Sequence, residues 1–256
     1  MGRPVGWTVA VVAAVMALLL GACGGEARPA GQLTPGSPTT QPSVAPAPTT
    51  ALVTAPTTSS TTTTSTTAPK PPPPTGLVDV QDLDPTIVVA LNKLTSDNFT
   101  GRPLPGYEAN RAFLLPDAAA ALARVQQRLV GEGHGLKVYD AYRPASATRA
   151  MVAAARAQGR GDLVGPYIAS VSYHNSGQAV DLTVIELATG QELDMGAPYE
   201  TFTPAAHTAN ATGQVARNRA ILVDAMHAEG FANYVGEWWH FNYFVPGAVI
   251  LDEPIR

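Results

Sequence analysis

The sequence predicts a single α+β domain, with a central antiparallel sheet packed by helices, over residues 77–256. Two observations support this class. Segments with helical spacing and segments with strand alternation follow one another without a regular β-α-β order, which favours α+β over a doubly wound parallel sheet. The stretch of roughly 180 residues is the length of one domain with a sizeable core. It contains no repeat of about 20 to 50 residues, so a solenoid is not expected.

The first 22 residues, MGRPVGWTVAVVAAVMALLLGA, have the order of a secretory signal peptide. Arg3 provides a basic start, Val9–Leu20 form an apolar centre, and small residues precede Cys23. Because a membrane-spanning helix needs about 20 apolar residues, this shorter stretch favours export over a membrane span. Its exit, LGAC, resembles the lipobox of bacterial lipoproteins, whose cysteine is lipidated after cleavage.

Cys23 is the only cysteine in the chain, so an intramolecular disulfide is excluded. One alternative is an ordinary signal peptide followed by a spare cysteine. Since an unmodified thiol is unusual in an exported protein, we expect a lipoprotein signal peptide over residues 1–22 and a lipid anchor on Cys23. An anchor with more than one acyl chain would hold the protein at the outer face of the cell membrane.

Residues 23–76 are expected to form a disordered linker. From Pro29 to Pro69 there is no charged side chain, and Pro, Thr, Ser and Ala dominate the composition. Such a segment cannot bury enough apolar surface to offset its chain entropy. The folded domain is therefore expected to begin near residue 77.

Within the domain, apolar spacing and terminal signals predict the elements in order. Asp84 and Pro85 suit the start of a short helix, and Pro116 and Asp117 suit the start of a longer one that stops at Gly131 or Gly133. Alternation, or aromatic and β-branched content, predicts strands elsewhere. The expected helices are 84–94, 116–133, 146–159 and 216–231, and the expected strands are 135–144, 179–187 and 237–245.

Two short stretches concentrate residues of the metal-ligand type. SYHNSGQAVDL contains His174 and Asp181, and EWWH contains Glu237 and His240. A catalytic Zn²⁺ takes three protein ligands of nitrogen or oxygen type and keeps one position open. His174, Asp181 and His240 supply that set, which leaves Glu237 as the general base for an attacking water. A His and an Asp at this spacing also occur often by chance, so neither stretch alone identifies a metal site.

The position of Glu237 sets a geometric condition. On a regular strand, residues three apart point to opposite faces, so Glu237 and His240 would diverge. Gly236 makes a bend before the strand plausible. We therefore expect the backbone to bend between Gly236 and His240, with Trp238 on the face of His240, and with Trp239 and Phe241 packed behind.

A third stretch, YDAYRPAS, places Arg143 at a strand end just before Pro144. A guanidinium there could stabilise the oxyanion of a tetrahedral intermediate, because it stays charged and offers several donors. Asp140 could orient it. The alternative is a surface ion pair, which is the more common role of an arginine before a proline.

Taken together, these motifs resemble one family. SDNFTGRPLPGY, YDAYRP, SYHNSGQAVDLT, MGAPYETF, NRAILVDAMHAEGF and EWWHF follow in the order found in the VanX-type D-alanyl-D-alanine dipeptidases. The resemblance covers nearly the whole domain and implies the fold of the zinc D,D-peptidases.

The resemblance assigns the same roles to the site residues. It makes His174, Asp181 and His240 ligands of one Zn²⁺, Glu237 the acid/base and Arg143 the transition-state clamp. It also implies that Ser172 and Glu200 bind the amino end of the substrate. Glu200 stands where the family more usually has Asp, and its carboxylate would select free dipeptides, because only a free ammonium could satisfy it there. The other three histidines, His134, His207 and His227, match no ligand position.

The sequence thus predicts a zinc metallopeptidase that hydrolyses D-alanyl-D-alanine outside the membrane, in the turnover of cell-wall peptides. The alternatives are a D,D-carboxypeptidase that trims peptidoglycan stem peptides and a non-catalytic cell-wall-binding lipoprotein. The expected partners are a small peptide substrate and the membrane, through the lipid anchor. Nucleic acid is not an expected partner, because the net charge is -4 and there is no basic run.

Overall fold

The computed structural model of the protein describes residues 69–256. The expected signal peptide over 1–22, the expected lipid anchor on Cys23 and most of the expected linker lie outside these residues. Within the described part, every helix is too short or too polar to cross a membrane.

The end of the expected linker contacts the domain. Lys70 Nζ lies 2.9 Å from Asp82 Oδ1, and Arg111 donates to the carbonyl oxygen of Pro71 at 2.8 Å. Pro74 is buried and its carbonyl accepts a hydrogen bond from Leu77 at 3.0 Å. The packed chain therefore begins a few residues before position 77.

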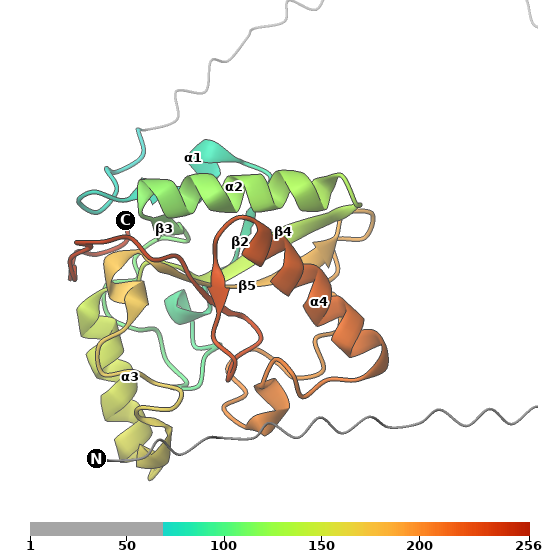
Figure 1. Ribbon diagram of the computed structural model, residues 1–256. Helices are drawn as coiled ribbons and strands as arrows, with labels where there is room; N and C mark the ends of the chain where they lie inside the picture. Colours follow the sequence, from blue (N-terminus) through green and yellow to red (C-terminus); the bar gives the residue numbers. More distant parts are fainter. Residues whose placement is uncertain (1–68) are drawn as a thin grey trace, which may run out of the picture. The chain divides into compact units, whose positions relative to one another are not determined.

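A five-stranded sheet forms the centre of the domain (Figure 1). Its order is β2-β4-β5-β7-β6, with bounds Val88–Val89, His134–Asp140, Ala179–Glu186, His240–Asn242 and Ala232–Asn233. All pairs are antiparallel except β2 with β4, which is parallel. The expected antiparallel sheet is thus confirmed for four strands and wrong for β2. Strand β5 is buried at every residue but its last, so it lies at the core.

Three helices surround the sheet, as Figure 1 shows. They are α2 (Pro116–Val130), α3 (Ala145–Ala157) and α4 (Gly213–Ala228). Helices α2 and α4 contact each other, and they pack on β4 and β5 respectively. The expected helices at 116–133, 146–159 and 216–231 are confirmed, with α4 beginning three residues earlier.

Smaller elements lie before and between these. Strands β1 (Val78–Asp79) and β3 (Phe113–Leu114) pair antiparallel, and α1 (Val80–Leu83) follows β1. Four 3-10 helices are η1 (Asn92–Leu94), η2 (Gly161–Leu163), η3 (Tyr173–Ser176) and η4 (Pro204–Ala206). Helix η3 leads directly towards β5 and holds the first of the predicted metal ligands.

The prediction of a helix over residues 84–94 is wrong. The segment forms β2 and then η1, and the amide of Ala90 donates to the carbonyl of Val138 in β4 at 2.9 Å. Four consecutive β-branched residues, Thr86, Ile87, Val88 and Val89, favour a strand beside the sheet over a helix. The strand expected over 237–245 is also shorter than expected and comprises only β7.

One arginine of α4 organises the long loop that precedes it. Arg219 is 2% exposed and donates to the carbonyl of Met195 at 2.9 and 2.6 Å. It also donates to the carbonyls of Ala205 at 3.0 Å and His207 at 2.7 Å. Because these carbonyls lie at both ends of residues 195–207, Arg219 fixes the segment that includes MGAPYETF.

Gly177 ends η3 in a backbone conformation and a packing environment that favour glycine. Its φ is +69°, and an added Cβ would lie 2.6 Å from Leu77 Cδ2. We expect Gly177→Ala to lower the free energy of unfolding by about 2–4 kcal/mol, from left-handed strain plus overpacking. Gly190 has a similar φ of +71° but open space around it, so Gly190→Ala should cost only about 1 kcal/mol. Urea unfolding of both variants measures the difference, and equal costs would contradict the packing argument.

Candidate active site

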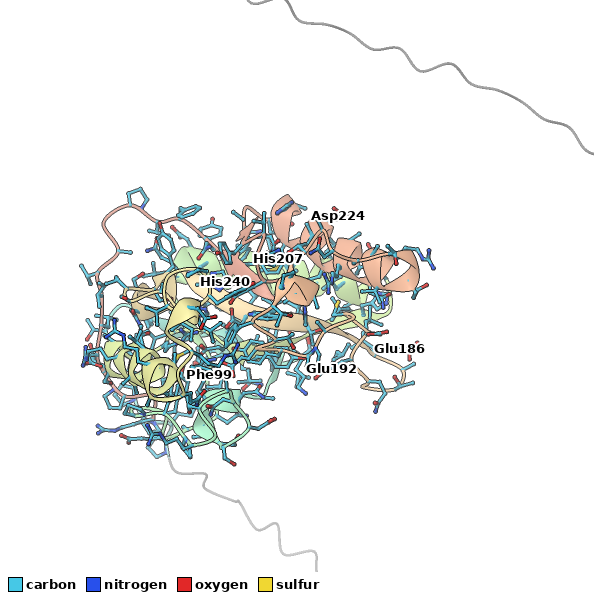
Figure 2. The ribbon with its side chains drawn as sticks, turned by 90° about the horizontal axis from the view of Figure 1, so that it is seen from below. Phe99, Glu186, Glu192, His207, Asp224 and His240 are labelled. Carbon is cyan, nitrogen blue, oxygen red and sulfur yellow. The ribbon has the colours of Figure 1, made fainter. Side chains whose placement is uncertain are left out.

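The predicted site residues converge on one cavity of about 240 Å³. Its wall includes every residue that the sequence suggested for catalysis, metal binding or substrate binding: Arg143, Ser172, His174, Asp181, Glu200, Glu237 and His240. Figure 2 shows His240 among the side chains of the domain, whereas Glu186 and Asp224 lie towards its edge. Residues from η3, β5, β7 and the loops between them therefore form a single site.

Two histidines and an aspartate lie close enough to hold one metal ion. Asp181 Oδ1 lies 3.2 Å from His174 Nε2 and 2.9 Å from His240 Nδ1, and the two nitrogens are 3.2 Å apart. Asp181 and His240 are opposite each other in the register of β5 and β7. Four ligands at about 2.0–2.2 Å from a tetrahedral Zn²⁺ are separated by roughly 3.3–3.6 Å. The three donor atoms thus fit such an ion after shifts of a few tenths of an ångström.

The remaining ring nitrogens fix the tautomers of both histidines. His174 Nδ1 donates to the carbonyl of Ala141 at 2.6 Å, because a carbonyl only accepts. His240 Nε2 lies 3.1 Å from Asn242 Oδ1. Each histidine can therefore offer its other ring nitrogen, once that nitrogen is deprotonated, to a metal ion beside Asp181, as metal-binding histidines do when an outer partner orients them.

Asp181 is ionised in this environment. It is 3% exposed, and burial by itself raises the pKa of its carboxyl. Interactions with His174 and His240 outweigh burial and hold the pKa of Asp181 well below its usual range. Its second oxygen, Oδ2, accepts a hydrogen bond from the Tyr199 hydroxyl at 2.8 Å.

The backbone before β7 bends as the sequence required. Turns occupy residues 235–236 and 238–239, and the amide of His240 donates to the carbonyl of Glu237 at 3.2 Å. The bend brings Glu237 Oε2 to 3.9 Å from His240 Nδ1. Burial, reinforced by the charge of Asp181, raises the pKa of Glu237 to about 8. A carboxyl with that pKa can both take up and release a proton near neutral pH.

The two tryptophans lie opposite to expectation. Trp239 lines the cavity, whereas Trp238 packs behind it and donates its indole N–H to the carbonyl of Ala197 at 3.0 Å. The turn at 238–239 interrupts the strand alternation on which the expectation rested. Phe241 is fully buried, as expected. Trp239 thus forms an apolar part of the cavity wall beside Glu237.

Arg143 is held in the cavity rather than at the surface. It is 7% exposed, and it donates to Asp140 Oδ2 through Nε at 2.9 Å and Nη2 at 2.6 Å. The Tyr107 hydroxyl donates to the other oxygen of Asp140 at 2.6 Å. Asp140 therefore orients the guanidinium as the sequence suggested, and the alternative of a surface ion pair is wrong.

Ser172 caps η3. Its Oγ accepts a hydrogen bond from the amide of His174 at 3.3 Å, and its own amide donates to Asn175 Oδ1 at 3.0 Å. This reciprocal pair is a capping box, which satisfies free amides at a helix start. Ser172 thus positions His174 and also faces the cavity.

Glu200 does not present an unpaired carboxylate. Its Oε1 lies 3.0 Å from Lys93 Nζ, and its Oε2 accepts a hydrogen bond from the amide of Phe99 at 2.7 Å. The expectation that only a substrate ammonium could satisfy this carboxylate is therefore wrong.

Two further residues of the site gave no signal in the sequence. Lys93 is 1% exposed and donates to the Tyr199 hydroxyl at 2.7 Å, which in turn donates to Asp181. A single lysine in an apolar segment is usually a surface residue, so the sequence does not place Lys93 in the site. Tyr199 lies in the motif MGAPYETF, in which only Glu200 was predicted to be a site residue. His134, His207 and His227 do not line the cavity, in agreement with the sequence.

The comparison with protein families agrees with this geometry. A family model described as D-ala-D-ala dipeptidase matches residues 74–254. The chain belongs to this family. The match begins at the buried Pro74 and includes every residue of the cavity, so the resemblance read from the motifs is confirmed.

Individual relatives of this D-Ala-D-Ala dipeptidase family member carry the same description. A D-alanyl-D-alanine dipeptidase of Enterococcus faecalis is 35% identical over 176 residues, which cover 62% of this chain and 84% of the relative. One of Streptomyces coelicolor is 36% identical over 164 residues, which cover 58% and 81%. A solved structure of the LD-carboxypeptidase LdcB matches with a TM-score of 0.39 and 20% identity, over 66% of this chain and 68% of that one.

Proposed function

We propose that this protein is a zinc-dependent dipeptidase that hydrolyses D-alanyl-D-alanine. The observation that carries the proposal is the convergence of His174, Asp181 and His240 beside the buried carboxyl of Glu237 in one cavity. Membership of the dipeptidase family supports the choice of substrate.

The donor set suits zinc. Two imidazole nitrogens and one carboxylate oxygen are the ligand types that catalytic Zn²⁺ takes, with a further position left open. When bound, the ion supplies Lewis-acid catalysis at the scissile carbonyl. A softer metal would favour sulfur ligands, and the cavity wall contains none apart from Met151.

The protein's own groups perform the proton transfers and stabilise charge. Glu237 takes a proton from the attacking water and later delivers it to the amine that leaves. Arg143 donates to the oxygen that becomes negative in the tetrahedral intermediate, and Asp140 holds it in place throughout. Trp239 excludes water from one side of the cavity, which strengthens these interactions.

The size of the cavity favours a small substrate. Its volume of about 240 Å³ is below the roughly 300–1,000 Å³ of pockets that bind drug-sized ligands. A dipeptide matches this volume better than a long peptide does.

We further propose that the enzyme acts outside the cell membrane. The basis is the signal-like sequence of residues 1–22, the LGAC exit with Cys23, and the Pro/Thr/Ser-rich segment that follows. D-alanyl-D-alanine made for wall synthesis is a cytoplasmic intermediate, so an exported enzyme serves the scavenging or remodelling of wall peptides rather than antibiotic resistance. Cys23→Ala should release the protein from the membrane fraction. Glycopeptide resistance caused by depletion of the cytoplasmic dipeptide would contradict the proposal.

The test of activity uses the purified protein with Zn²⁺ and D-alanyl-D-alanine. We expect release of D-alanine that stops when zinc is removed with a chelator and resumes when zinc is restored. Zinc binding without turnover of any D-alanyl-D-alanine substrate would contradict the enzyme and favour the non-catalytic cell-wall-binding protein.

A further inference from the structure

The hydroxyl of Tyr199 contacts the carboxylate that the site offers to a metal ion. It donates to Asp181 Oδ2 at 2.8 Å, whereas Arg143 Nη2 stays 3.7 Å from that oxygen, beyond hydrogen-bond distance. In the described part of the chain, Tyr199 is therefore the residue that donates a hydrogen bond to Oδ2. The other oxygen, Oδ1, lies beside His174 Nε2 and His240 Nδ1. The two oxygens of Asp181 thus have different partners.

A second contact fixes the direction of this hydrogen bond. Lys93 Nζ lies 2.7 Å from the hydroxyl oxygen of Tyr199. Burial lowers the pKa of Lys93, but Asp140 and Glu200 outweigh burial and hold that pKa above its usual value, so the group is an ammonium and only donates. The hydroxyl oxygen accepts from Lys93, and its single proton is left for the ionised carboxylate of Asp181.

The ring and the backbone of Tyr199 are both held in place. The ring stacks on that of Tyr139, with centroids 4.6 Å apart, and packs against Trp239 in a T-shaped arrangement at 5.3 Å. The backbone belongs to the segment 195–207, which Arg219 fixes through carbonyls near both ends. A side chain that is already ordered loses little further entropy when it makes a hydrogen bond. Tyr199 is therefore suited to orient Asp181.

An oriented carboxylate favours a catalytic metal site in two ways. Hydrogen bonds from outer groups hold ligating side chains in position and raise metal affinity. A carboxylate can also bind a metal ion through one oxygen or through both. Because Tyr199 engages Oδ2, Asp181 offers Oδ1 to the ion. Coordination through one oxygen leaves the open position that a catalytic zinc site keeps for water.

We propose that Tyr199 is a positioning residue of the metal site: its hydroxyl, oriented by Lys93, holds Asp181 so that one carboxylate oxygen serves as the ligand. The inference rests on the proposed function, because it concerns the zinc site of the same hydrolysis. Tyr199 acts through Asp181 and has no direct part in the proton transfers.

The first test measures the zinc affinity of Tyr199→Phe by competition with a chelator, on the purified protein below its melting temperature. Phenylalanine keeps the ring and its packing but has no proton to donate to Asp181. We expect the Kd for zinc to rise by about 10–100-fold, the usual effect of losing a group that orients a metal ligand. The melting temperature of the zinc-free variant checks that the fold is retained. An unchanged Kd would overturn the inference.

Tyr139→Phe is the matched control. It removes the hydroxyl of the tyrosine that stacks on Tyr199, and this hydroxyl donates to Glu192 at 2.7 Å, outside the catalytic cavity. The Kd of the control for zinc should stay close to that of the wild-type protein. An equal rise of Kd in both variants would mean that affinity follows the packing of the two rings, and would overturn the inference. A wild-type protein that does not bind zinc would instead overturn the proposed function.

A crystal structure of the zinc-loaded wild-type protein tests the same point without a substitution, so it holds even if Tyr199→Phe does not fold. We expect one oxygen of Asp181 on the ion and the Tyr199 hydroxyl within hydrogen-bond distance of the other oxygen. Both oxygens of Asp181 on the ion, or a Tyr199 hydroxyl turned away from Asp181, would overturn the inference and leave the zinc site itself standing.

Discussion

Replacing Glu237 with glutamine should reduce kcat for D-alanyl-D-alanine by roughly 10²–10⁴-fold, the usual contribution of a general acid/base. Glutamine has nearly the same shape as glutamate but cannot take up the proton of the attacking water. Glu237 is 6% exposed and sits on the bend that precedes His240, outside the three metal ligands. The variant should therefore bind zinc normally, which elemental analysis of the purified protein measures alongside kcat.

A matched control makes the same chemical change away from the cavity. Glu229 ends α4 and pairs with Arg124 and Arg128 on the surface. Surface ion pairs contribute at most about 1 kcal/mol, so Glu229→Gln should retain kcat within about twofold. Full activity in a zinc-loaded Glu237→Gln variant would remove Glu237 from the mechanism.

The regular elements were predictable because their signals are local. In α2, Ala118, Leu122, Val125 and Leu129 recur at helical spacing and are all buried, while Pro116 and Asp117 begin the helix. The stretch AVDLTVIEL, which includes β5, is predicted as a strand from the alternation of its apolar residues. Such patterns depend on neighbours within a few residues, which the sequence displays directly.

The grouping of His174, Asp181, Glu237 and His240 in one site was predictable for a different reason. Catalytic zinc needs particular residue types, and the order of the motifs restricted which of the five histidines could serve. The bend at Glu237 also followed from geometry, since residues three apart on a strand diverge. The same argument failed to predict which tryptophan faces the cavity, because the turn at residues 238–239 reverses the strand alternation of the side chains.

The Lys93–Glu200 pair could not be predicted, because it depends on contacts between distant parts of the chain. The two residues are 107 positions apart. Lys93 lies in a segment that favoured a helix by its spacing but forms β2 and η1 beside β4. Only that placement brings the ammonium into the cavity. The net charge around Glu200 is thus a tertiary property, which the motif containing Glu200 does not reveal by itself.

Asp181→Asn should abolish zinc binding as well as activity. Asp181 is the common neighbour of the site: it lies 3.2 Å from His174 Nε2, 2.9 Å from His240 Nδ1 and 2.8 Å from the Tyr199 hydroxyl. Mutation of groups that only orient the metal ligands typically reduces metal affinity by about 10–100-fold. Loss of the charged ligand itself should therefore reduce zinc affinity by more than about 100-fold.

Thermal unfolding with and without zinc measures this effect independently of catalysis. A ligand that binds only the folded state stabilises it by RT ln(1 + [L]/Kd), so zinc should raise the melting temperature of the wild-type protein. Zinc should do the same for Asp224→Asn, a control on the exposed side of α4 (Figure 2). Zinc should not change the melting temperature of Asp181→Asn. A full zinc shift in Asp181→Asn would contradict the assigned ligands.

The Glu237 and Asp181 variants together separate metal binding from proton transfer. Both replace one carboxyl group with an amide in the same cavity, so a purely structural role would make the two variants behave alike. The assigned roles instead require zinc to stabilise Glu237→Gln, which has lost turnover, and to leave Asp181→Asn unaffected. The reverse pattern would mean that Glu237 is the carboxylate ligand and Asp181 the base. Because Asp181 is opposite His240 in the β5–β7 register, whereas Glu237 lies 3.9 Å from His240 Nδ1 on a turn, the geometry favours the first pattern.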